Sequence, residues 1–219
     1  MDLLFFILCV ALGFLLSGIW FGLCLVIVTL TQKVKISWLS YLDTALASII
    51  PILLISTTMG IYPFQASGIH DIKVYFTAFL TVLITIVIVA FKKTTKSRKG
   101  KDLLLWGIDG MLMEIPQRLM MQSFVYGILK LLGVLYLTLY TVIATALIWC
   151  LAIGMQTVLS KKTFSKDVFI DVLASFVFSL GIGYVYQQTG FILISMIAHF
   201  SERIVSCYVA SKRIAINKE

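Results

Sequence analysis

Two short stretches of the sequence bring acidic and basic side chains together inside otherwise apolar segments. Glu114 and Arg118 lie four positions apart, which places both on one face of a helix. His199, Glu202 and Arg203 follow the i, i+3, i+4 spacing of a second helical face. Histidine carries protons near neutral pH, and a carboxylate beside it can orient its ring. These side chains are therefore candidates for proton transfer, and the guanidinium groups can bind a phosphate or an oxyanion.

The first cluster also contains Pro116, between Glu114 and Arg118. A proline removes one backbone donor and predicts a bend in the helix. A bend lined by polar side chains indicates a cavity rather than a lipid-facing surface. An isolated Glu-Arg pair could instead be a buried ion pair that only fixes helix packing. The second cluster, in which His199 lies one turn from an acid and a base, favours chemistry over that alternative.

The composition identifies the surroundings of both clusters as a lipid bilayer. Of 219 residues, 60% are hydrophobic and 13% are charged, which excludes a soluble enzyme, a disordered chain and a nucleic-acid-binding domain. A bilayer core takes about 20 apolar helical residues per span. We therefore expect one all-α membrane domain, residues 1–219, with seven transmembrane helices. The expected spans are Leu3–Leu30, Trp38–Ile61, Val74–Phe91, Leu103–Leu129, Leu135–Leu159, Val168–Gln187 and Phe191–Val209.

The positions of Lys and Arg predict the orientation of these helices. With the N-terminus outside and the C-terminus cytoplasmic, inner connections hold 14 of the 18 basic residues, as the positive-inside rule requires. They are Lys33, Lys35, Lys92, Lys93, Lys96, Arg98, Lys99, Lys101, Lys161, Lys162, Lys166, Lys212, Arg213 and Lys218. Outer connections hold only Lys73 and Lys130, and Arg118 and Arg203 lie within spans. Because a charge inside the membrane is costly unless it is paired or hydrated, these two arginines indicate function.

The depth of the clusters follows from the helical rise of about 1.5 Å per residue. Counted from Phe191 at the outer end of the last span, His199 lies roughly 12 Å deep and Glu202 roughly 16 Å deep. Arg118 lies about fifteen residues along a helix that starts inside at Leu103, again in the outer half. We therefore expect the site to open toward the external leaflet.

The two clusters and the stretch between them resemble the CPBP family, also called Abi, which includes the CAAX prenyl proteases. The segment 113–118 (MEIPQR) is similar to the family's first motif, two glutamates followed by three residues and an arginine. The segment 178–190 (FSLGIGYVYQQTG) resembles the family's glycine-rich turn, and His199 follows it where the last motif has its histidine. The resemblance covers residues 102–209, the expected catalytic core. Residues 1–91 carry no recognised motif.

Three positions depart from the family pattern. Met113 replaces the first of the paired glutamates. The middle motif, an aromatic residue followed four positions later by histidine, falls at Trp149, so Ile153 stands at the histidine position. Gln156 is the nearest polar substitute, and an interhelical hydrogen bond is its simpler role. Arg203 stands where the last motif usually has asparagine. The loss of a carboxylate and a histidine argues against the peptide hydrolysis that the family's proteases perform.

The resemblance is closest to the branch of small membrane proteins required for lipoprotein N-acylation. It implies an N-acyltransferase that moves a fatty acyl chain from a phospholipid or lysophospholipid to the α-amine of diacylglyceryl-cysteine at a bacterial lipoprotein N-terminus. In this hypothesis Glu114 or His199 is the general base. Arg118 stabilises the oxyanion or holds the donor phosphate. Glu202 orients His199, and Arg203 binds the donor headgroup or balances charge.

The expected partners are the bilayer of a bacterial cell membrane, the donor lipid, the diacylated lipoprotein and an enzyme that could supply lysolipid. No nucleic acid and no cofactor are expected, and the polar set is too small for a zinc site. Two alternatives stay open. One is a glutamate-type intramembrane endopeptidase in which Glu114 activates water. The other is a non-catalytic membrane scaffold in which the polar residues only lock helices together.

Overall fold

The long apolar stretches of the sequence form helices, as lipid requires. The computed structural model of the protein describes residues 3–34, 42–61, 66–92, 98–160 and 165–216, and no strand occurs among them. The helices are α1 (Leu3–Val34), α2 (Asp43–Met59), α3 (Ile72–Val89), α4 (Lys101–Glu114), the π-helix η2 (Ile115–Gln122), α5 (Ser123–Leu131), α6 (Leu137–Leu159), α7 (Lys166–Thr189) and α8 (Ile192–Ile216). The all-α prediction is confirmed for this part of the chain.

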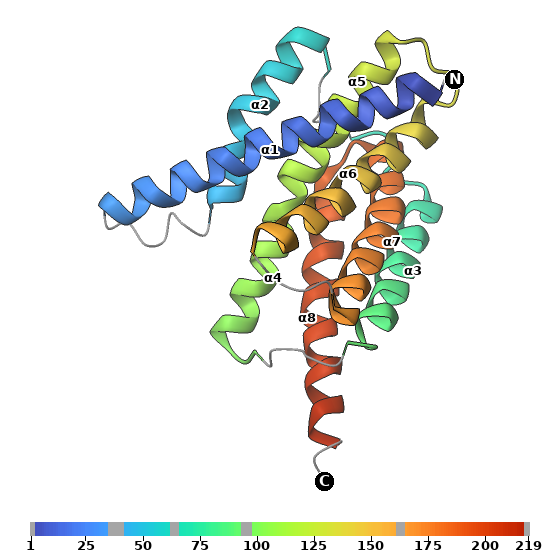
Figure 1. Ribbon diagram of the computed structural model, residues 1–219. Helices are drawn as coiled ribbons and strands as arrows, with labels where there is room; N and C mark the ends of the chain where they lie inside the picture. Colours follow the sequence, from blue (N-terminus) through green and yellow to red (C-terminus); the bar gives the residue numbers. More distant parts are fainter. Residues whose placement is uncertain (1–2, 35–41, 62–65, 93–97, 161–164, 217–219) are drawn as a thin grey trace.

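Within the described residues α4, η2 and α5 follow one another without a break, and successive helical segments of the chain alternate in direction (Figure 1). Among the residues that the structure describes, five helices are long and apolar enough to cross a membrane, namely α1, α3, α6, α7 and α8 up to Ala210. The apolar helix α2 is shorter, and the fourth expected span is divided among three elements. Five candidate spans are thus established, whereas the count of seven and the orientation stay predictions.

Part of the topology prediction falls on residues that the structure does not describe. These are Lys35, Trp38, Lys93, Lys96, Lys161, Lys162 and Lys218.

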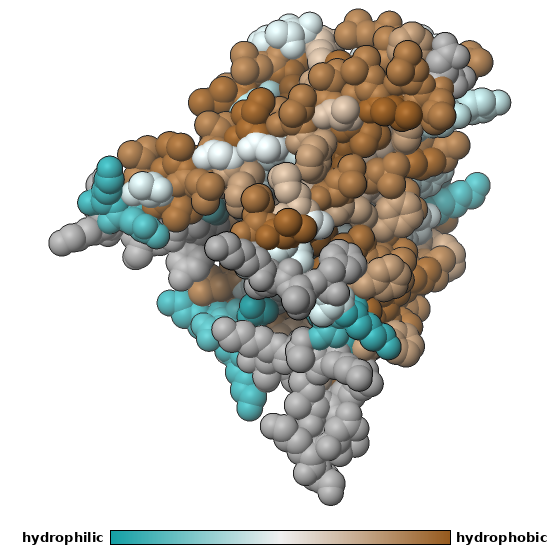
Figure 2. All heavy atoms as spheres, viewed as in Figure 1, coloured by the Kyte–Doolittle hydropathy of each residue, from teal (hydrophilic) through white to brown (hydrophobic). Residues whose placement is uncertain are grey.

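The outer surface of the bundle is apolar, as expected of a protein that faces lipid. Figure 2 shows hydrophobic residues over most of the visible face and hydrophilic ones gathered mainly toward the end where α8 finishes. Leu15 and Phe79 are examples of large apolar side chains that are more than 60% exposed. Such exposure would be a liability in water and is favourable in a bilayer.

Small residues and turns position the helices that carry the polar clusters. A Cβ at Gly181 of α7 would collide with the side chain of Thr81 in α3, so the glycine permits the close packing of these two helices. The turn from α7 to α8 uses Gly190 with φ 63°, and the Thr189 hydroxyl accepts a hydrogen bond from the backbone N–H of Phe191. The helices α7 and α8 therefore lie beside one another, next to α4 and η2.

Candidate active site

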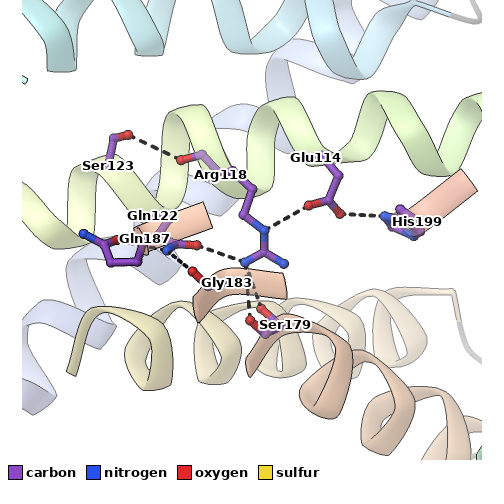
Figure 3. Close-up of polar contacts among 8 residues, drawn as sticks. All are labelled: Glu114, Arg118, Gln122, Ser123, Ser179, Gly183, Gln187 and His199. Atoms are coloured by element: carbon purple, nitrogen blue, oxygen red, sulfur yellow. Dashed lines mark hydrogen bonds and ion pairs between the residues drawn. The ribbon is translucent and has the colours of Figure 1, made fainter. Parts of the chain in front are cut away.

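The bend predicted at Pro116 takes the form of the π-helix η2. Pro116 has no N–H to donate, and beyond it the backbone changes to i→i+5 hydrogen bonds, such as that from Ser123 N–H to the carbonyl of Arg118. The side chains from Pro116 to Gln122 are all buried. The wider turn directs Arg118 and Gln122 toward α7, while Glu114 at the end of α4 points toward α8 (Figure 3).

Both oxygens of the Glu114 carboxylate are occupied by cationic or proton-bearing groups. Arg118 Nε donates to Oε2 at 2.9 Å, and His199 Nδ1 lies 2.6 Å from Oε1. The carboxylate and the guanidinium are both fully buried. An ion pair in a low-dielectric interior is held tightly when its hydrogen bonds are satisfied, and here Arg118 Nη2 is the one buried nitrogen of the pair without a partner among the described residues. Glu114 thus joins the first polar cluster to the second, from α4 to α8 (Figure 3).

Arg118 also connects this pair to α7 through a buried hydrogen-bond network. Its Nη1 lies 3.1 Å from Gln122 Oε1 and 3.4 Å from Ser179 Oγ. Gln122 in turn donates to the Gly183 carbonyl at 2.7 Å and to Gln187 Oε1 at 3.0 Å. A Cβ at Gly183 would lie 3.0 Å from Arg118 Nη1, so glycine leaves room for the guanidinium. Arg118 is therefore a positioning residue in this arrangement.

The hydrogen bonds of His199 define its tautomer. Arg203 Nε donates to His199 Nε2 at 3.4 Å, so the neutral ring accepts at Nε2 and carries its proton on Nδ1. The Nδ1–H group then donates to Glu114. The ring of Phe178 lies against the imidazole with 4.7 Å between centroids. A carboxylate that fixes the tautomer and leaves Nε2 as acceptor is the arrangement of a general base with its orienting acid.

The carboxylate that orients His199 is Glu114 and not Glu202, which corrects the role expected for Glu202. Glu202 Oε1 accepts a hydrogen bond from Ser206 Oγ at 2.7 Å, one turn further along α8. The i, i+3 spacing did place His199 and Glu202 on one face, and both line the same cavity. The carboxylate that pairs with His199 comes from another helix, and the residue spacing within α8 could not reveal that contact.

Arg203 makes a second set of contacts at the outer edge of this cluster. Its Nη1 donates to Asp109 Oδ2 at 2.6 Å, and its guanidinium carbon lies 3.9 Å from the centroid of the Trp106 ring. The guanidinium carbon of Arg98 lies 3.8 Å from the same centroid. Two cations thus contact the same indole ring, and tryptophan is the aromatic residue that binds cations most strongly.

A cavity of about 750 Å³ opens from this cluster. Helices α1, α6, α7 and α8 supply most of its wall, which includes His199, Glu202 and Arg203. Much of the remaining wall is apolar, and the volume suits a lipid-sized ligand. Glu114 and Arg118 do not line it. His199 is therefore the member of the Glu114–His199 pair that can meet a substrate.

Three further residues line the cavity, namely Met113, Ile153 and Gln156. Met113 and Ile153 depart from the family pattern, and Gln156 is the nearest polar substitute for the missing histidine. Met113 and Ile153 stand where a second carboxylate and a second histidine would face the cavity, so its inner wall is apolar at both places. Gln156 is exposed to the cavity, and its side chain makes no hydrogen bond with the described residues. Its expected interhelical bond is therefore not found there.

The cavity extends from His199 to the end of the bundle where Lys92, Arg98 and Asp171 line it, and this end is called its mouth below. Lys92 Nζ pairs with Asp171 Oδ1 at 2.7 Å, at the junction of α3 and α7. The orientation predicted from the Lys and Arg positions would put this end on the cytoplasmic side. It therefore does not agree with the predicted opening of the site toward the external leaflet, and both stay predictions. Depth along a helix locates a residue but does not reveal which side the space between helices opens to.

Sequence reasoning missed Gln122, Trp106 and the role of Asp109 as partner of Arg203. Gln122 had a signal, because Glu114, Arg118 and Gln122 repeat at four-residue steps along one helical face. Trp106 had none, since its contacts come from residues 98 and 203. Across the described residues, no three His, Cys, Asp or Glu side chains gather as a possible metal site.

Comparison with known proteins places these residues in a family. No curated protein and no solved structure matches the chain. A family model described as Type II CAAX prenyl endopeptidase Rce1-like matches residues 100–205, a range that contains Glu114, Arg118 and His199. Over this range, just under half of the chain, the protein is similar to the Rce1-like group of the membrane-embedded CPBP family.

Proposed function

We propose that the protein is a membrane N-acyltransferase. It moves a fatty acyl chain from a phospholipid or lysophospholipid to the α-amino group of diacylglyceryl-cysteine at the N-terminus of a bacterial lipoprotein. The observation that carries the proposal is the contact of 2.6 Å between Glu114 and His199, with His199 on the wall of a largely apolar cavity. This arrangement supplies a general base where an acyl chain can be bound.

In the proposed reaction the acceptor amine replaces Arg203 Nε as the donor to His199 Nε2 and loses a proton to that atom, and the amine nitrogen attacks the ester carbonyl of the donor lipid. The C–N bond forms, the ester C–O bond breaks, and the proton passes from His199 to the departing glycerol oxygen. Glu114 holds the ring and stabilises the imidazolium. Arg203 is the guanidinium beside the developing oxyanion, because it lies on the wall and contacts His199.

The apolar wall favours transfer to an amine over hydrolysis. A hydrolase must bind and activate water, whereas a transferase must exclude it. Met113 and Ile153 present apolar surface at the two wall positions where the family's proteases have a carboxylate and a histidine. Neither of these two side chains can form a hydrogen bond to water. An amine brought to His199 would then compete successfully for the acyl group.

The position of the site fits donor and acceptor arriving from opposite ends. His199 lies seven residues, or about 10 Å, from the start of α8, and the cavity runs from it toward the end with Lys92 and Arg98. With the orientation predicted from the sequence, the donor lipid enters from the cytoplasmic leaflet. The lipoprotein amine reaches His199 from the opposite end, where α8 begins, over the shorter distance.

A second candidate is an intramembrane endopeptidase. Two observations favour it: the matching family model is named for a prenyl endopeptidase, and the cavity opens at the end that a cytoplasmic peptide would meet. In this reaction His199 would activate water, with Glu114 orienting it, and the products would be a shortened peptide and a released fragment.

Mass spectrometry of lipoprotein N-termini tests the proposal in cells with and without the protein. We expect triacylated N-termini only when the protein is present, and their loss when His199→Gln replaces the wild type. Unchanged proportions of diacylated and triacylated forms would exclude the acyltransferase. A shortened peptide that depends on His199 would establish the second candidate instead.

A further inference from the structure

Arg98 is a cation at the mouth of the cavity that has no acidic partner in the part of the chain that the structure describes. No carboxylate of the described residues lies within 4.0 Å of its guanidinium, whereas Lys92 is paired with Asp171 and Arg203 with Asp109. Arg98 is half-buried and lines the cavity. A guanidinium in such a place, at the edge of a lipid phase, is stabilised by an anion supplied from outside the chain.

Trp106 holds Arg98 and Arg203 in a fixed relation to each other. Both guanidinium carbons lie within 4 Å of the centroid of its ring. The stacking orients two planar groups of donors at the mouth before any ligand binds, which lowers the entropy cost of binding. Guanidinium groups bind phosphate through two parallel hydrogen bonds, which a lysine in the same place could not do.

We propose that Arg98, Trp106 and Arg203 form a binding site for the phosphate of a membrane phospholipid. This proposal rests on the proposed function, because it assigns the headgroup of the acyl donor. Arg203 connects the site to the chemistry, since its Nε lies 3.4 Å from His199 Nε2. A phospholipid whose phosphate lies against Arg98 and Arg203 brings its nearby ester carbonyl toward His199, with the acyl chain along the apolar wall.

The same chemistry could bind free phosphate, and the experiment separates the two sources. Purified full-length protein is incubated with phosphatidylglycerol or with diacylglycerol of the same chains, and bound lipid is counted by native mass spectrometry. A third arm adds millimolar inorganic phosphate as competitor. The variants are Arg98→Gln and Trp106→Leu. The matched control is Lys99→Gln, which removes an exposed charge next to Arg98 that does not line the cavity.

We expect the wild type and Lys99→Gln to prefer phosphatidylglycerol over diacylglycerol by about tenfold or more. Arg98→Gln and Trp106→Leu reduce that preference to about threefold or less. Inorganic phosphate leaves the bound lipid in place; if it displaces phosphatidylglycerol, the site binds free phosphate and the lipid assignment is wrong. Equal binding of both lipids by the wild type overturns the proposal. So does an Arg98→Gln variant that behaves like Lys99→Gln.

A transfer assay keeps the failure of this proposal distinct from the failure of the proposed function. In one outcome the wild type binds phosphatidylglycerol in preference to diacylglycerol, Arg98→Gln loses this preference, and yet the wild type produces no N-acylated peptide. That result would support the phosphate site and exclude the acyltransferase. If transfer occurs and Arg98→Gln leaves the KM for phosphatidylglycerol unchanged, the phosphate site is excluded and the acyltransferase is supported. If Arg98→Gln does not fold, Trp106→Leu carries the same comparison.

Discussion

His199 Nδ1 lies 2.6 Å from Oε1 of Glu114, although 85 positions separate the two residues. The contact joins the end of α4, where the backbone changes to a π-helix, to the first third of α8. It gives a fully buried carboxylate two partners and gives a wall histidine one fixed tautomer. The buried acid thus acts on a substrate only through the histidine.

Glu114→Gln is expected to reduce both stability and activity. The substitution leaves the Arg118 guanidinium fully buried without a counter-charge, and breaking a buried ion pair in this way costs about 3–5 kcal/mol of unfolding free energy. The transfer rate should fall by about 10²-fold or more, because His199 loses the group that orients it. Denaturant unfolding of the purified protein and initial rates in proteoliposomes measure the two effects.

The double variant Glu114→Gln with Arg118→Met separates these two effects. Removing both charges of the pair should restore part of the unfolding free energy, since no lone buried charge remains. Activity should stay low, because the acid beside His199 is still missing. A double variant whose stability loss equals the sum of the single losses would show that the two residues do not act as a pair.

Gln122→Leu should destabilise the protein by about 1–3 kcal/mol, because it removes the buried donors to α7 and leaves the Gly183 carbonyl without its partner. The matched control is Gln156→Leu, which changes the same chemical group at a cavity-exposed position and should alter stability by less than about 0.5 kcal/mol. Thermal unfolding in detergent compares the two. Equal shifts in Tm would mean that the Gln122 network does not stabilise the fold.

Gly181→Ala should destabilise the contact between α3 and α7 by about 1–3 kcal/mol, because the added methyl group meets the Thr81 side chain. Combining it with Thr81→Ala should recover much of the loss, since the smaller residue makes room for the new methyl group. The measurement is a double-mutant cycle on unfolding free energy. Strictly additive losses would place the effect of Gly181 elsewhere in the fold.

Particular residues show how far the sequence determines this structure. Apolar runs predicted most of the helices, and four-residue spacing predicted the Glu114–Arg118 pair, because both follow from local periodicity. The form of the bend at Pro116 was not predictable, since a proline permits several ways of rearranging the backbone hydrogen bonds. The partner of Glu202 and the opening of the cavity depend on how α1, α6 and α8 pack. No pattern within a single helix reports that packing.

The orientation of the bundle is expected to place the cavity mouth on the cytoplasmic side. Single cysteines introduced at Lys101, near the mouth, and at Lys130, at the opposite end of the same pass, can be treated with a membrane-impermeant maleimide. We expect Lys130→Cys to be labelled in intact cells and Lys101→Cys only after permeabilisation, as the basic residues near the mouth require. The reverse pattern would contradict both the orientation and entry of the donor from the cytoplasmic leaflet.

The central claim is that His199, oriented by Glu114, is the general base. It is tested most directly by the rate of acyl transfer to a diacylated lipopeptide in proteoliposomes containing wild type or His199→Gln. We expect the rate to fall by about 10²- to 10⁴-fold, with Tm nearly unchanged, since the side chain reaches the cavity wall and a glutamine can still donate to Glu114. A His199→Gln protein that transfers acyl chains within about threefold of the wild-type rate would contradict it.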